Sequence, residues 1–369
     1  MSASKTSKIT CKNLFSDVLH RPYFCAFTPL GPYTTSIPVQ NEIPRLSELT
    51  MADFSKNWAG RPFILTDEIT QWPAYKEWST EALLKAYGDV EFRAEAVDWP
   101  LKTYVEYMNS NTDESPLYLF DRAFVEKMQV MVGQVEQRQY WTPRCFGEDL
   151  FAVLGEERPD SRWLIIGPER SGSTFHKDPN ATSAWNAVLR GSKYWIMFPN
   201  SMKTPPGVYV SSDESEVTSP LSIAEWLISY HAEARKTLGC IEGICNEGEI
   251  LYVPSGWWHL VVNLKPSIAI TENFVPEAHL VNAMKFLRDK RNQVSGFKED
   301  VQNPYDLFIQ RMEQQDTRTL SEATKLLGNI GAGKKRKWDS LVNGTCGAKA
   351  EGRNDFSFGF GEASDEDLP

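Results

Sequence analysis

Two histidines and an aspartate constrain this chain more than any other feature of its sequence. His176 and Asp178 stand two residues apart in the motif His-Lys-Asp, and His259 follows about 80 residues later in the run Gly-Trp-Trp-His. The chain has only five histidines, so two of them in this pattern form a specific signal. Two histidines and one carboxylate bind one face of a non-haem Fe(II) ion and leave the opposite positions open. The sequence therefore predicts a metal site with these three ligands.

The spacing of the ligands favours β-structure. In an extended strand alternate side chains share a face, so His176 and Asp178 point the same way while the lysine between them points the other way. The third ligand must then come from another strand. Residues 248–254 read as a strand, residues 255–256 as a turn, and residues 260–264 as a second β-rich run. A histidine at the mouth of such a unit suits metal binding in a small β-barrel.

The segments that carry these ligands resemble the Jumonji-C (JmjC) oxygenases. The matching segments are residues 171–179 (SGSTFHKDP), 182–186 (TSAWN), 191–195 (GSKYW), 253–259 (VPSGWWH) and 269–274 (AITENF). Within that family the resemblance is closest to the nuclear lysyl-hydroxylase type once called the phosphatidylserine receptor, together with its fungal relatives. It is dense from about Trp163 to Phe274 and looser from about Ile43 to Asp121.

The resemblance implies a mainly β fold with flanking helices (α+β). The core is expected to be a double-stranded β-helix, a cupin-like jelly roll, with an N-terminal mixed region and C-terminal helices. The expected divisions are an N-terminal arm (1–38), a JmjC catalytic region (39–276, core motifs about 130–276), C-terminal helices (277–330) and a flexible tail with a basic cluster (331–369). Helical spacing also predicts an inserted helix from Ser222 to Thr237 and C-terminal helices over 277–291 and 304–327.

A lysine marks the expected co-substrate pocket. Residues 186–198 predict a hairpin that turns at Gly191, with Lys193 just after the turn and its ammonium directed into the barrel. A buried ammonium is costly unless an anion meets it. The resemblance supplies that anion, the distal carboxylate of 2-oxoglutarate. Without the resemblance, Lys193 reads as a solvated hairpin lysine.

Five further residues are assigned to this pocket through the resemblance. It implies hydrogen bonds to 2-oxoglutarate from Asn186 and Thr271, and further contacts from Ser173 and Tyr118. Asn273 shares a strand face with Thr271 and is expected to line the same site. Taken alone, Thr271 reads as an ordinary strand threonine.

The ligand count leads to a reaction class. Three protein ligands leave three positions on an octahedral Fe(II) ion, two for 2-oxoglutarate and one for O2. Iron and the keto acid supply the chemistry, while the protein orients and shields. Hydroxylation of a lysine in a nuclear protein is the favoured interpretation, and N-methyl demethylation of histone lysine or arginine is the alternative. A catalytically weak chromatin or complex-forming adaptor is the alternative from another class, and the intact triad argues against it.

Composition and net charge limit the classes of partner that the protein is expected to bind. At 41.9 kDa with 41% hydrophobic residues, the chain can bury a sizeable core. We expect no membrane partner, because no apolar run or signal-peptide stretch is evident, and six scattered cysteines are expected to be reduced thiols of an interior compartment. The net charge of −10 argues against direct nucleic-acid binding. The expected partner is a protein that presents lysine or arginine side chains, a histone or another nuclear protein.

Two features near the C-terminus bear on location and assembly. Residues 334–337 (KKRK) read as a nuclear localisation signal, with a solvated charge run as the alternative. The nucleus is the expected location, and the cytoplasm is a second one. The apolar stripe of the helix predicted over 304–327 favours plain packing, and a homodimer remains the alternative.

Overall fold

The computed structural model describes residues 22–131 and 138–328, and the chain divides into two compact units, Met1–Ala323 and Thr324–Pro369. Only residues 324–328 of the second unit are described, so the account below concerns the first unit. The predictions made for residues 1–21, and for the tail with its basic cluster at residues 334–337, lie outside the described residues.

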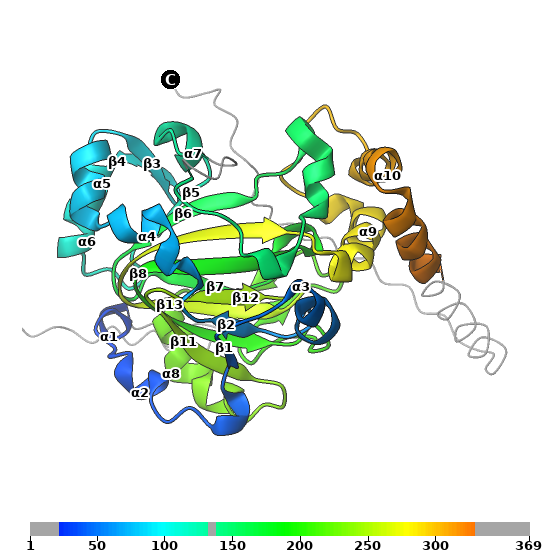
Figure 1. Cartoon of the computed structure of the whole chain (residues 1–369). Coiled ribbons are helices and arrows are strands. Elements are labelled where there is room, and N and C mark those ends of the chain that lie inside the picture. Colours follow the sequence, from blue (N-terminus) through cyan, green and yellow to red (C-terminus); the bar gives the residue numbers. More distant parts are fainter. Residues whose placement is uncertain (1–21, 132–137, 329–369) are drawn as a thin grey trace, which may run out of the picture. The chain divides into compact units, whose positions relative to one another are not determined.

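Strands form the centre of the first unit (Figure 1). Their bounds are β1 (Arg45–Leu46), β2 (Phe63–Leu65), β3 (Glu91–Ala94), β4 (Val97–Pro100), β5 (Leu119–Asp121), β6 (Arg162–Gly167), β7 (Gly172–His176), β8 (Ser183–Phe198), β9 (Tyr209–Val210), β10 (Val217–Thr218), β11 (Ile241–Asn246), β12 (Ile250–Val253) and β13 (Trp258–Phe274). All except β9 and β10 belong to one sheet, in the order β1-β2-β12-β8-β13-β6-β5-β3-β4, with β11 paired to β8 and β7 paired to β13. The pairing is antiparallel except between β1 and β2.

Helices flank this sheet (Figure 1). Their bounds are α1 (Pro22–Ala26), α2 (Gly31–Thr34), α3 (Met51–Asp53), α4 (Pro73–Glu77), α5 (Thr80–Tyr87), α6 (Leu101–Ser110), α7 (Phe124–Lys127), α8 (Ile223–Ala234), α9 (Leu280–Asp289) and α10 (Pro304–Gln315). Short helical turns complete the chain: η1 (Val39–Asn41), η2 (Phe54–Trp58), η3 (Glu68–Gln71), η4 (Arg144–Phe146), η5 (Leu150–Glu157), η6 (Pro179–Ala181), η7 (Glu277–His279) and η8 (Arg291–Gln293).

Two long strands, β8 and β13, hold the architecture together. They pair with each other from Ser183 opposite Phe274 to Phe198 opposite Trp258. The first half of β8 also pairs with β12, and its second half pairs with β11. Strand β13 pairs with β7 through its first half and with β6 through its second half. Each long strand therefore has different partners along its two halves, and this mainly antiparallel arrangement, with the match to a cupin-like domain reported below, confirms the expected jelly roll.

The chain bends at Gly191 and does not turn back there. The predicted hairpin is wrong, because β8 continues through this residue while the register of β13 shifts opposite it, between Asn263 and Ala269. Gly191 has a φ of +85°, and a Cβ at this position would lie 2.4 Å from the carbonyl oxygen of Pro266. Only glycine tolerates both conditions. The glycine signal was real, but it marks a bend within a strand.

The two halves of the long strands face each other across an apolar interior. Ala184 and Val188 from the first half of β8 belong to the same buried cluster as Trp195 and Met197 from its second half. Leu251 of β12 lies in this cluster too. Burying each large apolar side chain contributes roughly 1.5–3 kcal/mol to stability. This shared interior therefore holds the two halves of β8 and strand β12 together. The functional side chains described below project into this interior.

Helix α8 confirms the predicted insertion. The Ser222 side chain accepts a hydrogen bond from the backbone N–H of Glu225, as expected of an N-cap residue. The C-terminal prediction is confirmed at Pro304, which opens α10, but the helix expected to run to residue 327 is interrupted. Asp316 has a φ of −146° and a ψ of 73°, so α10 ends at Gln315.

A buried ionic network attaches α8 to the barrel. Glu242 of β11 is 1% exposed and accepts hydrogen bonds from the Arg235 guanidinium at 2.7 and 3.0 Å. The Tyr194 hydroxyl also donates to Glu242, and its oxygen lies 2.9 Å from the His231 ring nitrogen. These contacts hold the pKa of Glu242 at about 2 against the opposing effect of burial. The N-terminal segment joins through Asn41, whose amide donates to the Arg235 carbonyl.

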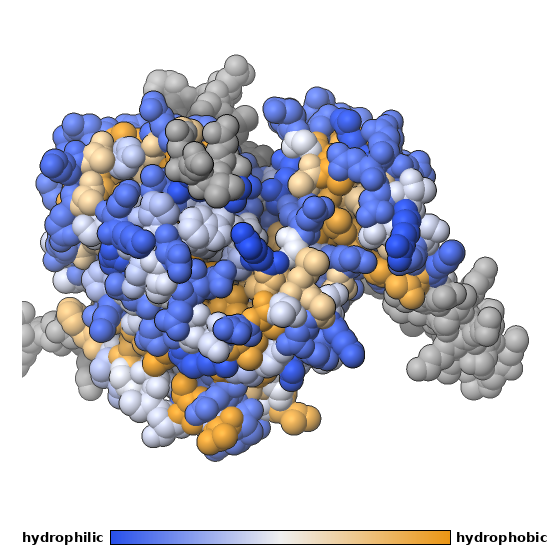
Figure 2. Space-filling model, viewed as in Figure 1, coloured by the Kyte–Doolittle hydropathy of each residue, from blue (hydrophilic) through white to orange (hydrophobic). Residues whose placement is uncertain are grey.

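The surface drawn in Figure 2 is hydrophilic over most of its area, with smaller hydrophobic patches between. No helix of the described part of the chain has the length and apolar character needed to cross a lipid bilayer.

Candidate active site

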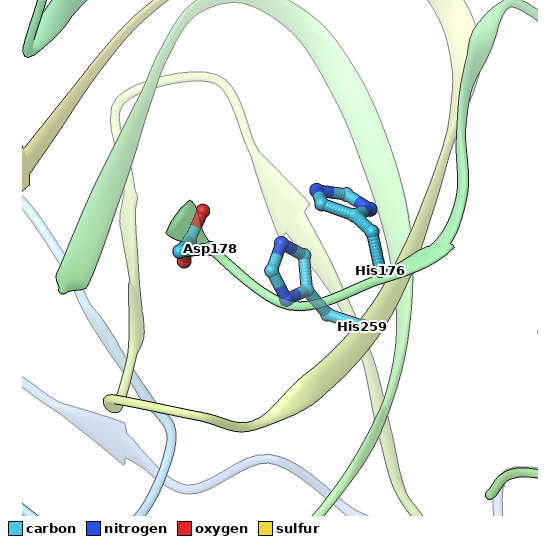
Figure 3. Close-up of side chains that lie close together, drawn as sticks. All are labelled: His176, Asp178 and His259. Carbon is cyan, nitrogen blue, oxygen red and sulfur yellow. The ribbon is translucent and has the colours of Figure 1, made fainter. Parts of the chain in front are cut away.

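The structure brings the three predicted metal ligands together. His176 ends β7, Asp178 follows in extended backbone (φ −62°, ψ 145°), and His259 is the second residue of β13. His259 pairs with His176 in the ladder, and their ring centroids lie 4.1 Å apart. One ligand atom from each of the three residues lies within 4.8 Å of the other two. Figure 3 shows the two imidazoles side by side with the Asp178 carboxylate facing them.

Backbone carbonyl groups set the tautomer of both histidines. Nδ1 of His176 lies 2.7 Å from the Thr174 carbonyl oxygen, and Nδ1 of His259 lies 3.1 Å from that of Trp257. Because a carbonyl oxygen only accepts, Nδ1 carries the proton in each ring. Nε2 then keeps its lone pair for a metal, and the hydrogen bond fixes the ring's orientation.

The charge states in the site depend on burial. Burial lowers the pKa of His259 well below its usual value, and His176 adds to that effect. Burial raises the pKa of Asp178 to about 6, against the opposing effects of His176 and of the Asn273 amide. Oδ2 of Asp178 is buried without a hydrogen-bond partner in the described structure. Two imidazole Nε2 atoms and a carboxylate with an unpartnered oxygen fit a divalent transition metal, which would supply the missing partner.

Lys193 lies inside the barrel, as predicted, although it reaches this position on a continuous strand. Its side chain is fully buried, and its ammonium donates to the Tyr118 hydroxyl at 2.6 Å and to Oδ1 of Asn263 at 3.1 Å. Burial lowers the pKa of Lys193 to about 7. Within the described residues, no carboxylate forms an ion pair with this ammonium. A buried cation with only neutral partners forms a natural site for the carboxylate of a small ligand.

Asn186 and Thr271 lie opposite each other on β8 and β13. Asn186 is buried and its Oδ1 has no partner in the described structure, whereas the Thr271 hydroxyl donates to the Trp185 carbonyl oxygen at 2.8 Å. The Asn273 amide lies 3.5 Å from Oδ1 of Asp178 and 3.1 Å from the Thr182 hydroxyl. Of the three residues, Asn186 therefore has a buried polar atom without a described partner, and Asn273 contacts a proposed metal ligand directly.

Ser173 faces the interior because of an irregularity in β7. Ser173 and His176 are three positions apart in the sequence. Their partners on β13, Val261 and His259, are only two positions apart. The extra residue brings both side chains to the same face. Ser173 is half-buried and forms no hydrogen bond with the Lys193 group in the described structure, so its contact with 2-oxoglutarate stays a prediction.

Asn263 belongs to the pocket, although the sequence analysis did not predict this. It pairs with Lys193 across the two long strands and is 0% exposed. Its Oδ1 accepts from Lys193, and its Nδ2 donates to the Ser171 hydroxyl at 2.9 Å. The available signal was an amide within the otherwise apolar run 260–264, because a buried polar group needs partners.

A cavity of about 570 Å³ opens over the metal ligands. His176 and Asp178 line it, together with both polar and apolar side chains. The further lining residues are Lys177, Pro179, Ala181, Asn200, Lys203, Val210, Glu214, Ser215, Val217, Ser255, Gly256, Trp258, Asn282, Lys285, Phe286, Lys290, Asn292 and Gln293. The volume lies within the range of cavities that bind small molecules or single side chains.

Comparison with known proteins agrees with this geometry. Residues 56–279 match the family described as Cupin-like domain. The chain is 39% identical to Arginine-specific demethylase JMJ22 of Arabidopsis thaliana over 347 residues, which cover 92% of this chain and 67% of that protein. It is 33% identical to the bifunctional arginine demethylase and lysyl-hydroxylase psr-1 of Caenorhabditis elegans, covering 66% of this chain and 64% of psr-1.

A more distant relative points to the same co-substrate. The chain is 26% identical to the 2-oxoglutarate and iron-dependent oxygenase JMJD4 of Homo sapiens, covering 65% of this chain and 62% of JMJD4. This chain thus spans about two thirds of the length of each of these three relatives. With its cupin-like barrel, its His-Asp-His triad and these relatives, the chain belongs to the JmjC family of iron- and 2-oxoglutarate-dependent oxygenases.

Proposed function

We propose that this protein hydroxylates lysine side chains of a nuclear protein, using Fe(II), 2-oxoglutarate and O2. The observation that carries the proposal is the pairing of two sites in one barrel. His176, Asp178 and His259 offer a facial set of metal ligands, and Lys193 offers a buried cation for a carboxylate. A scaffold without catalysis needs neither site. In particular, the unpaired ammonium destabilises the ligand-free fold.

Different residues of the site would bind the iron and the 2-oxoglutarate. The triad would hold iron on one side only, which keeps the other side free for the keto acid and O2. Lys193 would bind the distal carboxylate of 2-oxoglutarate, with Tyr118 and Asn263 holding the ammonium in place. Asn186, whose Oδ1 has no partner in the described structure, would donate from its Nδ2 to the same molecule. When bound, iron and 2-oxoglutarate supply the oxidation, in which 2-oxoglutarate and O2 become succinate and CO2 and one oxygen atom enters a substrate C–H bond.

Arginine N-methyl demethylation is the second candidate, and a specific observation favours it. JMJ22, 39% identical over 92% of this chain, is named an arginine-specific demethylase, and psr-1 is named for both activities. Both reactions begin with oxygen insertion into a C–H bond. They differ in the carbon presented, because an N-methyl carbon that gains a hydroxyl releases formaldehyde. The nucleus is proposed as the location from the basic cluster at residues 334–337.

Mass spectrometry of peptides separates the candidates. The full chain would be incubated with Fe(II), ascorbate, 2-oxoglutarate and basic peptides, with and without methylated arginine. We expect a gain of one oxygen on lysine peptides, accompanied by succinate. Loss of a methyl group with formaldehyde would establish the demethylase instead.

Two variants make the result specific. Asp178→Asn removes a ligand charge at nearly constant shape, and Asp98→Asn makes the same change on the exposed face of β4. We expect the first to abolish turnover and the second to retain it. If the wild-type chain forms no succinate with or without peptide, the enzyme proposal fails and the adaptor becomes the better interpretation.

A further inference from the structure

The mouth of the cavity carries a positive charge that contrasts with the chain as a whole. Four lysines line the cavity, whereas Glu214 and the proposed metal ligand Asp178 are its only acidic lining residues in the described structure. The chain overall has a net charge of −10. A local excess of one sign at a cavity mouth selects the charge of what approaches it. The four lysines are Lys177, Lys203, Lys285 and Lys290.

Two of these lysines already have acidic partners. The Lys285 ammonium lies 2.7 Å from the Asp289 carboxylate, one helical turn away on α9. The Lys290 ammonium lies 3.2 Å from Glu214 and donates to the Asp213 carbonyl oxygen at 2.9 Å. Each of these two ammonium groups therefore has a carboxylate partner within the protein, although Asp289 is shared with Arg288.

The other two lysines have no acidic partner among the residues that the structure describes. The Lys177 ammonium donates to Oδ1 of Asn200 at 2.9 Å and lies 4.8 Å from the centre of the Trp258 ring. Both partners are neutral. Lys203 follows three residues after Asn200 in the loop that leaves β8, and its side chain is exposed. The mouth thus presents two ammonium groups that form no ion pair with a described carboxylate, although Glu214, the partner of Lys290, also attracts Lys177.

The position of Lys177 ties this charge to the reaction centre. Its two sequence neighbours, His176 and Asp178, contribute ligand atoms to the metal group, while its own ammonium reaches Asn200 outside it. Asn200 is held close to the turn before β13, since a Cβ on Gly256 would come within 2.8 Å of its Cγ. Lys177 is therefore held in the lining of the cavity, next to the metal ligands.

We infer that the mouth binds an acidic side chain of the substrate protein, next to the residue that is oxidised, through Lys177 and Lys203. The inference rests on the proposed function, because it assumes that a basic side chain enters the cavity. A lysine or arginine approaching two ammonium groups that have no ion-pair partner is repelled, and a neighbouring carboxylate on the substrate offsets that repulsion. The preferred substrate is a basic residue in an acidic segment, and a run of basic residues of the histone-tail type is disfavoured.

Binding of matched peptides tests the inference. Three short labelled peptides share a central lysine and differ only in its flanking residues, which are glutamate, glutamine or lysine. Fluorescence polarisation with the full chain, loaded with Mn(II) and 2-oxoglutarate without O2, gives each Kd. At low salt we expect the glutamate peptide to bind about tenfold tighter than the glutamine peptide, with the lysine peptide weakest. The preference should shrink as salt is added.

Lysine variants assign the preference to the two residues. Lys177→Gln combined with Lys203→Gln should remove most of the preference for glutamate. Lys177→Arg should keep it, because it retains the charge. Lys285→Gln is the matched control, since that lysine already has a carboxylate partner in Asp289, and the preference should persist. Equal or tighter binding of the lysine peptide, no detectable binding of any peptide, or an unchanged preference in the double variant would each overturn the inference.

Succinate formation separates this inference from the proposed function. If 2-oxoglutarate is converted to succinate and the peptide preference is absent, the inference about the mouth fails alone. If the preference is present without any succinate, the mouth binds as inferred and the oxygenase proposal fails. Calorimetric titration of 2-oxoglutarate into each variant shows whether the metal site is intact, so loss of peptide binding is not mistaken for loss of the site.

Discussion

Replacing Lys193 with methionine should stabilise the ligand-free protein and abolish 2-oxoglutarate binding. The ordinary lysine pKa of 10.5 falls to about 7 in the folded chain, which corresponds to roughly 5 kcal/mol of unfavourable free energy for burying the ammonium. Methionine fills similar space without the charge. Its cost is the lost hydrogen bonds to Tyr118 and Asn263, about 1–3 kcal/mol. The expected net gain is therefore about 2 kcal/mol or more.

Urea unfolding at several pH values measures this effect. Because the folded pKa of Lys193 lies below the unfolded one, the unfolded chain binds more protons between pH 7 and pH 10.5. The stability that this group contributes therefore rises with pH through that window. Lys193→Met should remove this rise. Lys265→Met, at an exposed lysine on β13, is the control and should leave it unchanged.

Ligand-induced stabilisation completes the test. A metal-loaded wild-type chain should gain about 2.7 kcal/mol when 2-oxoglutarate is present at 100 times its Kd. Lys193→Met should show no such gain. The reasoning is refuted if Lys193→Met is less stable than the wild type without ligand and is still stabilised by 2-oxoglutarate.

Three further substitutions test other parts of the structure. Gly191→Ala should destabilise the fold by about 2 kcal/mol or more, because its φ of +85° and its close approach to β13 exclude a side chain, and a lower urea midpoint would show it. Glu242→Gln leaves the partly buried Arg235 guanidinium without its counter-charge and should cost about 3 kcal/mol at pH 7. Since the folded pKa of Glu242 is about 2, the wild type should lose this contribution as pH falls below about 4.5, and the variant should not; equal acid sensitivity would contradict this. Asn263→Leu should weaken 2-oxoglutarate binding by about tenfold with the metal site intact, and an unchanged calorimetric Kd would count against the role of this amide.

The metal ligands could be predicted because the signal is local. His176 and Asp178 are two residues apart, and the strand-turn-strand unit around His259 is contiguous in sequence. Helix α8 was predictable for the same reason, since Ser222 and the apolar spacing that follows lie within a few turns. Assigning the remaining pocket residues required a family resemblance, because their roles depend on a ligand that the sequence does not show.

The incorrect and missed predictions concern residues whose structure depends on pairing with strands far away in the sequence. Gly191 has the turn chemistry of a hairpin, yet positive φ also suits a bend within a strand. The choice depends on β13, which lies more than 60 residues further along the chain. Asn263 was missed for a related reason, because a polar residue in a strand reads as solvent-facing until its partner Lys193 is known. Local patterns predict elements, and long-range register determines what each element presents.

The residues assigned to the co-substrate and those at the cavity mouth lie on different parts of the structure. Most of the first group lies on the antiparallel strands β8 and β13. Lys193 and Asn263 are paired across these strands, and so are Asn186 and Thr271, so these groups assigned to the co-substrate are held by a rigid lattice of backbone hydrogen bonds. The mouth is built largely from loops and from the surface of α9. Exchanging the loop that carries Lys203 should therefore change which protein substrate is bound without changing the binding of 2-oxoglutarate. Natural divergence of substrate choice within this architecture is expected to follow the same division.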